Sequence, residues 1–286
     1  MTVLEAIQRS AEFLGRKGVE SPRLQAELLL AHLLQQPRLR LYLEFERQLT
    51  PAEVDALREM IRRRGQREPL QYITGRAAFC GRDLRVNRHV LIPRPETEQL
   101  AELGWTRLLQ QPAPRRVLDV GTGSGCLAIA LVEHCPDTWC VALDASPEAL
   151  AVARENIAEA GLADRIELVE GRGLSALPQE PAFHLIISNP PYIPSGDLPT
   201  LPPEVRDYEP RLALDGGPDG LEAFRWLAAE ARSRLRPEGL LLVECGDGQA
   251  GPVSALFQQY GWVITGIHQD YAGKPRFVEA RPAQSG

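Results

Sequence analysis

The feature that most constrains the fold is an apolar run that leads directly into a glycine-rich turn. Residues Val117–Val120 are typical of a short buried β-strand, Gly121–Gly125 form a Gly-x-Gly-x-Gly loop, and Cys126–Glu133 continue as a helix. Glycines let the backbone approach a ligand closely, and the N-terminus of a helix offers that ligand unpaired N–H groups. The pattern predicts a βα unit whose turn binds a ligand.

Strands and helices alternate through the rest of this region, as is typical of α/β proteins. Further strands are expected at Trp139–Leu143, Ile166–Val169, Phe183–Ile187 and Gly239–Val243, with a closing pair at Val263–Ile267 and Arg276–Ala280. This pattern predicts a doubly wound, mostly parallel, Rossmann-like sheet, in which ligands bind beyond the carboxyl ends of the strands. If the strand at 183–187 lies beside the strand at 117–120, one crevice opens at the ends of both.

Asp144 follows the second strand, about twenty residues after the loop, where a carboxylate can accept hydrogen bonds from both hydroxyls of a ribose. Alternatively, it only caps the helix that starts at Pro147. The loop lacks the Gly-x-Gly-x-x-Gly spacing of dinucleotide sites, and no second mononucleotide-binding half is recognisable. S-adenosylmethionine, which has one ribose and no pyrophosphate, therefore fits best.

A second unusual segment follows the strand at 183–187 and reads Ser188-Asn189-Pro190-Pro191-Tyr192. The Asn189 carboxamide oxygen and the carbonyl of Pro190 can together accept both protons of an –NH2 group. The lone pair of that nitrogen then faces the carbon to be attacked, and the Tyr192 ring can cover the flat face of the target. A bare Asn-Pro pair would indicate only a turn. In a chain that also has a nucleotide-type loop, the segment predicts a binding site for a planar amino group.

The N-terminal region has a different character. Four amphipathic helices are expected there, with capping boxes at Thr2 and Thr50 and a further helix start at Ser21-Pro22. We expect an all-α bundle over residues 1–70, a β-hairpin linker over 71–92 and the α/β domain over 93–286. Because the bundle carries no catalytic constellation, we assign it to recognition of a substrate protein.

Composition argues against several classes of protein. The net charge of −6 disfavours non-specific binding to duplex nucleic acid, which depends on basic side chains that displace counterions. Five cysteines without a Cys-x-x-Cys pair favour reduced thiols, and five scattered histidines give little support for a metal site. The apolar runs are too short to cross a bilayer, and no secretory segment is recognisable. A globular cytoplasmic protein without a membrane partner is expected.

The motifs together resemble a known family. The strand and glycine loop resemble those of class I S-adenosylmethionine-dependent methyltransferases, and Asn189–Tyr192 resembles the motif of members that methylate planar amino groups. More specifically, segments along nearly the whole chain resemble the bacterial release factor glutamine methyltransferases of the HemK type; they are residues 69–75, 91–98, 209–221 and 244–249.

The resemblance implies an activity and a set of site residues. The reaction would move a methyl group from S-adenosylmethionine, leaving S-adenosylhomocysteine, to the amide nitrogen of the glutamine in the Gly-Gly-Gln motif of peptide chain release factors, in support of translation termination. The cofactor-binding residues would be Gly121, Thr122, Gly123, Ser124, Gly125, Asp144 and Asn189. The glutamine would be held by Asn189, Pro190, Pro191 and Tyr192, with Asn189, Pro190 and Tyr192 as the catalytic residues and Phe79 packed on the substrate side chain.

Two positions depart from the family pattern. After the third strand the family usually has an acidic and then an aromatic residue near the adenine, whereas this chain has Arg172-Gly173. We expect Arg172 to stack on the adenine, or the backbone of Arg172 and Gly173 to hold it. The acidic residue that often precedes the hairpin aromatic is here Ala78.

An alternative function is methylation of adenine amino groups in nucleic acid, because the exocyclic amine suits the same acceptors and Tyr192 could stack on a flipped base. The acidic net charge and the lack of a long basic recognition region argue against it, and no direct nucleic-acid contact is expected. A binding module without enzymatic activity would leave the cofactor loop and the amide-binding segment unexplained together.

Overall fold

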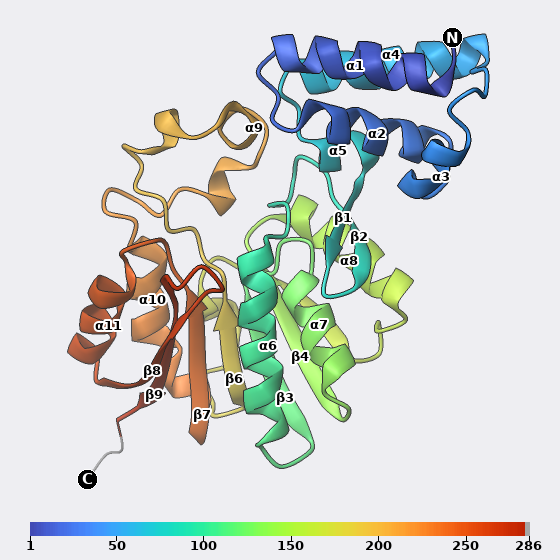
Figure 1. Ribbon diagram of the computed structural model, residues 1–286. Helices are drawn as coiled ribbons and strands as arrows, with labels where there is room; N and C mark the ends of the chain where they lie inside the picture. Colours follow the sequence, from blue (N-terminus) through green and yellow to red (C-terminus); the bar gives the residue numbers. More distant parts are fainter. Residues whose placement is uncertain (284–286) are drawn as a thin grey trace. The chain divides into compact units, whose positions relative to one another are not determined.

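The computed structural model describes residues 1–283, which divide into two compact units (Figure 1). Unit 1 comprises Met1–Arg76 together with Pro202–Tyr208, and unit 2 comprises Ala77–Leu201 together with the chain from Glu209 onward. The last three residues of the α/β domain expected over 93–286 lie outside the described residues.

Unit 1 is helical. Its helices are α1 (Val3–Arg16), α2 (Pro22–Leu33), α3 (Arg38–Leu43), α4 (Pro51–Gly65), α5 (Leu70–Thr74) and the short α9 (Pro203–Arg206). Side chains from α1, α2, α3 and α4 form its core, in which Leu14, Leu29, Leu30, Leu41 and Leu57 are almost completely buried. No helix within residues 1–283 is both long and apolar enough to cross a membrane.

The helix starts in unit 1 agree only partly with the sequence. Both predicted capping boxes are present, because Thr2 Oγ1 accepts a hydrogen bond from Glu5 N at 3.1 Å and Thr50 Oγ1 accepts one from Glu53 N at 3.3 Å. The expected start signal at Ser21 is wrong in one respect. Its φ of 46° places the backbone in the left-handed region, and its side chain caps nothing.

The segment Pro202–Tyr208 belongs to unit 1 through charged and polar contacts. Glu204 pairs with Arg64 at 2.9 Å and with Arg67 at 2.7 Å, and the Tyr208 hydroxyl donates to the carbonyl of Gln66 at 2.7 Å. The side chain of Arg64 is buried, so its ion pair with Glu204 is shielded from water better than a surface pair would be.

Within its described residues, unit 2 is built on a seven-stranded sheet with the strand order β5-β4-β3-β6-β7-β9-β8. The strands are β3 (Arg115–Val120), β4 (Thr138–Asp144), β5 (Ile166–Glu170), β6 (Phe183–Ser188), β7 (Leu235–Glu244), β8 (Trp262–Gln269) and β9 (Pro275–Pro282). Strands β5, β4, β3, β6 and β7 run parallel, and β9 is antiparallel to β7 and β8. The strands β1 (Arg76–Phe79) and β2 (Arg82–Arg85) form a separate pair. The predicted doubly wound, mostly parallel sheet is confirmed.

Helices cover both faces of this sheet (Figure 1). On one face lie α6 (Pro95–Leu109), α7 (Cys126–His134) and α8 (Pro147–Ala160), and on the other lie α10 (Glu222–Glu230) and α11 (Ala250–Gln259). Successive strand residues point to opposite faces, so Val117 packs in the first layer and Leu118 in the second. Short 3-10 turns complete the unit at Leu174–Ala176, Leu198–Thr200, Arg211–Ala213 and Arg232–Arg234.

The winding of the sheet reverses beside β3. This strand lies between β4 and β6, and Val120 is in register with Leu143 on one side and with Ser188 on the other. The carboxyl ends of the three strands therefore lie level with one another. The glycine loop, Asp144 and Asn189 all occur at this edge, where doubly wound sheets bind their ligands.

Candidate active site

A cavity of about 700 Å³ opens beyond the carboxyl ends of β3, β4 and β6. Its wall includes several of the residues predicted from the sequence, namely Gly121, Gly123, Asp144, Arg172, Gly173, Asn189, Pro190 and Pro191. The glycine loop and residues 189–191 therefore border one cavity. The common crevice expected from the sequence is present.

The glycine loop needs glycine for two physical reasons. Gly121 and Gly123 have φ values of 74° and 56°, where other residues are strained, and the space in which a Gly121 side chain would begin holds no atom within 4 Å. Gly125 instead packs closely, because a Cβ there would lie 3.4 Å from the Cβ of Ala153 in α8. The first two glycines shape the cavity wall, and Gly125 allows α7 to pack beside α8.

Thr122 and Ser124 do not line the cavity; they support the loop from behind. Thr122 Oγ1 donates to Asp119 Oδ2 at 2.6 Å, and the Ser124 carbonyl accepts from Asn156 Nδ2 at 2.8 Å. Asp119 is completely buried, and burial raises its pKa to about 7. Its second oxygen, Oδ1, has no hydrogen-bond partner among the described residues.

Asp144 joins the loop to the start of α8. Its Oδ2 accepts from Gly123 N at 2.8 Å and its Oδ1 accepts from Ser146 N at 2.9 Å. The residue that caps α8 is Ser146, whose Oγ accepts from Ala149 N at 3.1 Å, so capping does not explain Asp144. Burial raises the pKa of Asp144, although the N–H groups of Ser146 and Gly123 oppose the rise. Each carboxylate oxygen keeps acceptor capacity for a ligand.

Asn189 and Pro190 present two open acceptors. The Asn189 Nδ2 group donates to Thr97 Oγ1 at 3.0 Å, and Thr97 Oγ1 donates to Glu244 Oε2 at 2.8 Å. Among residues 1–283, no hydrogen bond occupies Asn189 Oδ1 or the Pro190 carbonyl. Both can accept from an –NH2 group in the cavity. The sequence assigned no role to Thr97 or Glu244, although both lie in segments that resemble the family.

Two predicted substrate contacts do not reach the cavity wall. Phe79 is 2% exposed and packs in the hydrophobic layer with Leu84 and Leu100. Tyr192 is partly buried against the layer under α10 and α11, and its carbonyl accepts from Gln249 Nε2 at 2.9 Å. Burial, with a smaller contribution from the Glu244 carboxylate, raises the pKa of Tyr192 to about 12. Neither residue lines the cavity, and their contact with the substrate stays a prediction.

Arg172 and Gly173, the predicted adenine contacts, both line the cavity. The Arg172 side chain is exposed at the cavity and has no ion pair or hydrogen bond among residues 1–283. Gly173 has a φ of 75°, and the next residue, Leu174, donates its N–H to Glu230 Oε2 at 2.9 Å. A free guanidinium and a turned backbone thus border this end of the cavity.

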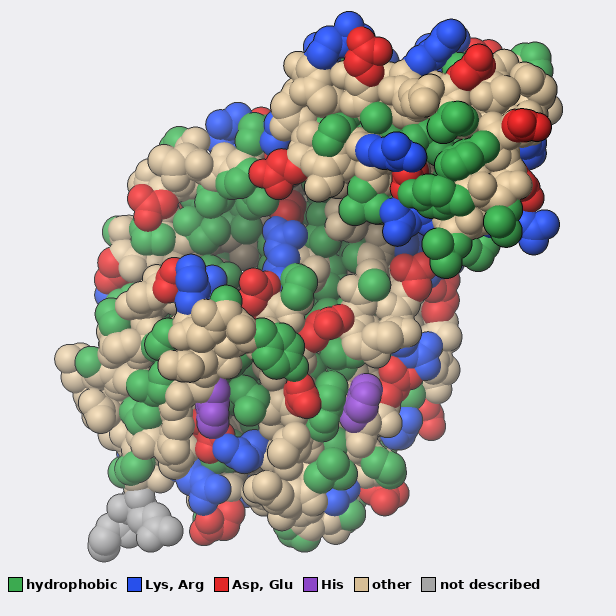
Figure 2. All heavy atoms as spheres, in the orientation of Figure 1, with side chains coloured by type: hydrophobic (Ala, Val, Ile, Leu, Met, Phe, Trp, Pro, Cys, Tyr) green, Lys and Arg blue, Asp and Glu red, His purple; other side chains and the backbone are tan. Residues whose placement is uncertain are grey.

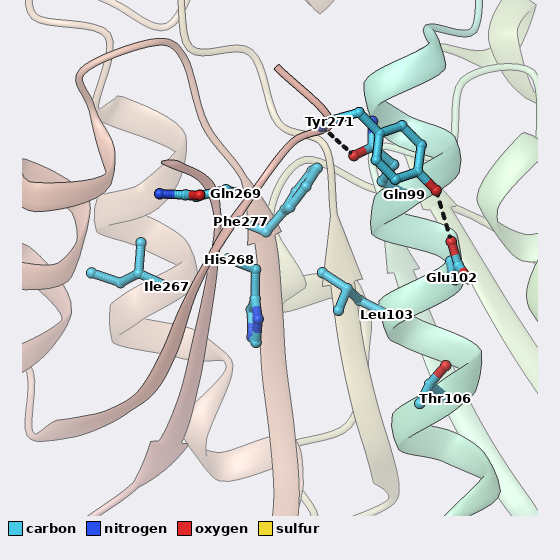
Figure 3. Close-up of a pocket in the computed structure, with 9 residues that line it drawn as sticks. All are labelled: Gln99, Glu102, Leu103, Thr106, Ile267, His268, Gln269, Tyr271 and Phe277. Atoms are coloured by element: carbon cyan, nitrogen blue, oxygen red, sulfur yellow. Dashed lines mark hydrogen bonds between the residues drawn. The ribbon is translucent and has the colours of Figure 1, made fainter. Parts of the chain in front are cut away.

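A second cavity, of about 530 Å³, lies between α6 and the strands β8 and β9 (Figure 3). The Tyr271 N–H donates to Gln99 Oε1 at 2.8 Å and the Tyr271 hydroxyl donates to Glu102 Oε2 at 3.3 Å, so both bonds cross from the β8–β9 turn to α6. None of the site residues predicted from the sequence lines this second cavity.

Similarity to known proteins extends over nearly the whole chain. Residues 5–75 match the family described as PrmC N-terminal domain, and residues 104–198 match the methyltransferase small domain. The release factor glutamine methyltransferase of Geobacter sulfurreducens is 43% identical over 98% of this chain and 96% of its own length. That of Chlorobaculum tepidum is 44% identical over 94% of each chain. The chain belongs to the release factor glutamine methyltransferase family.

Family membership confirms the resemblance drawn from the motifs. It makes the protein an enzyme of the methyltransferase class, and this class of methyltransferases uses S-adenosylmethionine as its methyl donor. A solved methyltransferase structure from Pyrococcus furiosus is 19% identical with a TM-score of 0.53, covering 72% of this chain and 92% of that one. That likeness shows the shared fold alone.

Proposed function

We propose that this enzyme transfers a methyl group from S-adenosylmethionine to the side-chain amide nitrogen of the glutamine in the Gly-Gly-Gln motif of peptide chain release factors. The observation that carries the proposal is the pair of open acceptors, Asn189 Oδ1 and the Pro190 carbonyl, in the cavity that the glycine loop also borders. Relatives that are 43% and 44% identical over almost their full lengths are named for this activity.

The residues around the cavity fit S-adenosylmethionine. A volume of about 700 Å³ lies in the usual range for small-molecule sites. The open space at Gly121 lets a ligand approach the backbone, Asp144 offers a carboxylate to the ribose hydroxyls, and Arg172 can stack on the adenine. When bound, this cofactor supplies an electrophilic methyl group.

An amide nitrogen is a poor nucleophile because its lone pair is delocalised into the carbonyl. Asn189 Oδ1 and the Pro190 carbonyl accept the two N–H bonds of the substrate amide and so fix the direction in which the nitrogen points. The same two dipoles stabilise the positive charge that grows on this nitrogen, and the proton leaves to solvent afterwards. The residues act by positioning and by preorganised electrostatics, and no strong base is required.

The alternative substrate, adenine in nucleic acid, has less support. The arginine cluster at the end of α4 pairs with carboxylates inside unit 1; the pairs are Arg62–Glu59, Arg63–Glu68, Arg64–Glu204 and Arg67–Glu204. Figure 2 shows positive and negative side chains interspersed over the visible face. A basic track for a phosphate backbone would instead need unpaired cations side by side.

We propose that unit 1 recognises the release factor. Its short helix α3 exposes large apolar side chains, with Leu39 at 73% and Leu43 at 85%, and hydrophobic side chains gather over α2 and α3 in Figure 2. Changing Leu39 and Leu43 together to serine should raise KM for the release factor several-fold and leave cofactor affinity unchanged. Leu109→Ser, at a half-exposed position in unit 2, is the matched control.

The activity is tested with labelled S-adenosylmethionine and, in parallel, an intact release factor, the same factor with its Gly-Gly-Gln glutamine changed to alanine, and duplex DNA. We expect label only on the intact factor, and mass mapping should locate one added methyl group on that glutamine. Asn189→Ala should abolish transfer while cofactor affinity falls only modestly. Label on the factor whose Gly-Gly-Gln glutamine is replaced by alanine, label on DNA, or near wild-type turnover by Asn189→Ala would each contradict the proposal.

A further inference from the structure

The orientation of the Asn189 carboxamide is held by a buried chain of two hydrogen bonds. Thr97 lies in the first turn of α6 and is 3% exposed, and Glu244 ends β7 and is 2% exposed. Asn189 Nδ2 donates to Thr97 Oγ1 at 3.0 Å, and Thr97 Oγ1 donates to Glu244 Oε2 at 2.8 Å. These three side chains come from elements that are far apart in the sequence and meet behind the cavity wall.

The protons available to these three side chains decide which group donates in each of the two hydrogen bonds. A threonine hydroxyl carries one proton, and an ionised carboxylate can only accept. When Glu244 is ionised, the Thr97 proton is committed to Glu244, so Thr97 meets Asn189 with a lone pair. Only the –NH2 end of the Asn189 carboxamide can satisfy that lone pair, and the Asn189 oxygen is then turned toward the cavity.

We propose that Thr97 and Glu244 are positioning residues, and that the ionised state of Glu244 selects the Asn189 orientation in which Oδ1 faces the substrate. The inference rests on the proposed function only in naming a substrate amide as the group that Asn189 accepts from. A protonated Glu244 could donate to Thr97, and the Thr97 proton could then reach Asn189 Oδ1. In the reversed orientation the –NH2 group of Asn189 would face the –NH2 group of the substrate, and the hydrogen bond from the substrate amide to Asn189 Oδ1 would be lost.

The surroundings of Glu244 bring its ionisation close to neutral pH. Burial raises the pKa of Glu244 to about 7, against the opposing effects of the Thr97 hydrogen bond and the Arg276 charge. The other groups that face it are Arg94 and Glu96 at the start of α6, Tyr192 after β6, Cys245 beside it and Arg276 on β9. Because desolvation outweighs the nearby arginines, a moderate fall in pH is enough to protonate it.

The kinetic test follows kcat for release factor methylation from about pH 5.5 to about pH 8.5. In the wild type we expect kcat to fall on the acid side with an apparent pKa near that of Glu244. Glu244→Gln should have a flat profile at a rate about tenfold to a hundredfold below the wild-type plateau, and Thr97→Val should behave in the same way. Thr97→Ser, which keeps the hydroxyl, should retain the wild-type profile, and KM for the cofactor should not change in any variant. A wild-type acid limb in Glu244→Gln, or full activity in Thr97→Val, would overturn the inference.

A second readout needs no substrate. Heteronuclear NMR of the full-length protein follows the side-chain –NH2 signals of Asn189, assigned by their loss in Asn189→Ala. They should titrate with Glu244 in the wild type and in Thr97→Ser, and not in Thr97→Val or Glu244→Gln. If these signals titrate while the wild type fails to methylate a release factor, the proposed function is wrong and the positioning role stands. If methylation occurs and the signals do not titrate, the positioning role is wrong.

Discussion

Replacing Glu244 by glutamine is expected to stabilise unit 2 at alkaline pH, and the sign follows from the pKa of this carboxyl. Burial raises the pKa of Glu244 in the folded protein from 4.5 to about 7, so the folded state binds its proton more tightly than the unfolded state does. The wild type is therefore penalised for holding an ionised Glu244 above pH 7, and the penalty disappears as the pH falls below the unfolded value. Glutamine keeps the shape without the charge, and its carboxamide can turn either its oxygen or its –NH2 group toward Thr97.

The size of the effect comes from the same shift. One pKa unit corresponds to about 1.4 kcal/mol, so the penalty amounts to about 3 kcal/mol at pH 8 and to less than about 1 kcal/mol at pH 5. The free energy of unfolding of Glu244→Gln, minus that of the wild type, should thus rise by about 2 to 3 kcal/mol between these two pH values. Any constant offset from the substitution itself cancels in this comparison.

Urea denaturation followed by tryptophan fluorescence measures this difference in unfolding free energy for unit 2, which contains Glu244. All four tryptophans of the chain lie in unit 2; they are Trp105, Trp139, Trp226 and Trp262. Glu167→Gln, at an exposed position of β5, is the control and should stay within about 0.5 kcal/mol of the wild type at each pH. A difference for Glu244→Gln that does not change with pH, or that shrinks as the pH rises, would refute the reasoning.

Three other substitutions test different parts of the structure. A methyl group on Gly216 would lie 2.8 Å from the backbone of Tyr192, so Gly216→Ala should lower kcat at least about tenfold in the methylation assay and spare cofactor affinity in calorimetry. Phe79→Ala should lower the free energy of unfolding of unit 2 by about 3 kcal/mol in urea; a raised KM for the release factor without this loss would instead support the predicted substrate contact. Thr50→Ala should destabilise unit 1 by about 1 kcal/mol by circular dichroism, and Ser21→Ala, which removes no cap, should cost less.

The arrangement of the cavity could be predicted because it follows from local pattern and one rule of topology. Strand signals ahead of the glycine loop, Asp144 and Asn189 were each visible in the sequence. Parallel strands end at the same edge of a sheet, so three residues that follow neighbouring parallel strands must lie close together. Only the neighbour relation between β3 and β6 had to be assumed, and the structure confirms it.

The support behind the cavity could not be predicted in this way. Thr97 and Glu244 are 147 positions apart, and a threonine early in a helix is indistinguishable from an ordinary capping residue. Phe79 shows the converse problem. An aromatic residue in an alternating hairpin has the same pattern whether its ring faces a ligand or the core, and the choice depends on packing with Leu100 of α6.

The sequence also does not reveal that residues 202–208 belong to unit 1. Nothing in this short proline-flanked stretch marks it as part of a helical unit, because the arginines that bind Glu204 lie 137 and 140 positions away. Long-range ion pairs leave no periodic signal in a sequence. The same holds for Ser21, whose left-handed backbone depends on how the chain turns between α1 and α2.

The placement of α9 in unit 1 has a consequence for how this protein can be taken apart. Along the described chain the polypeptide passes between the two units three times, after Arg76, after Leu201 and after Tyr208. A shortened protein that began at residue 77 would keep Glu204 and lose both arginines that neutralise it. A graft of residues 1–76 onto another enzyme would leave α9 behind. Neither unit is one continuous segment of the chain, so recombination at a single junction cannot exchange a whole unit with that of another protein.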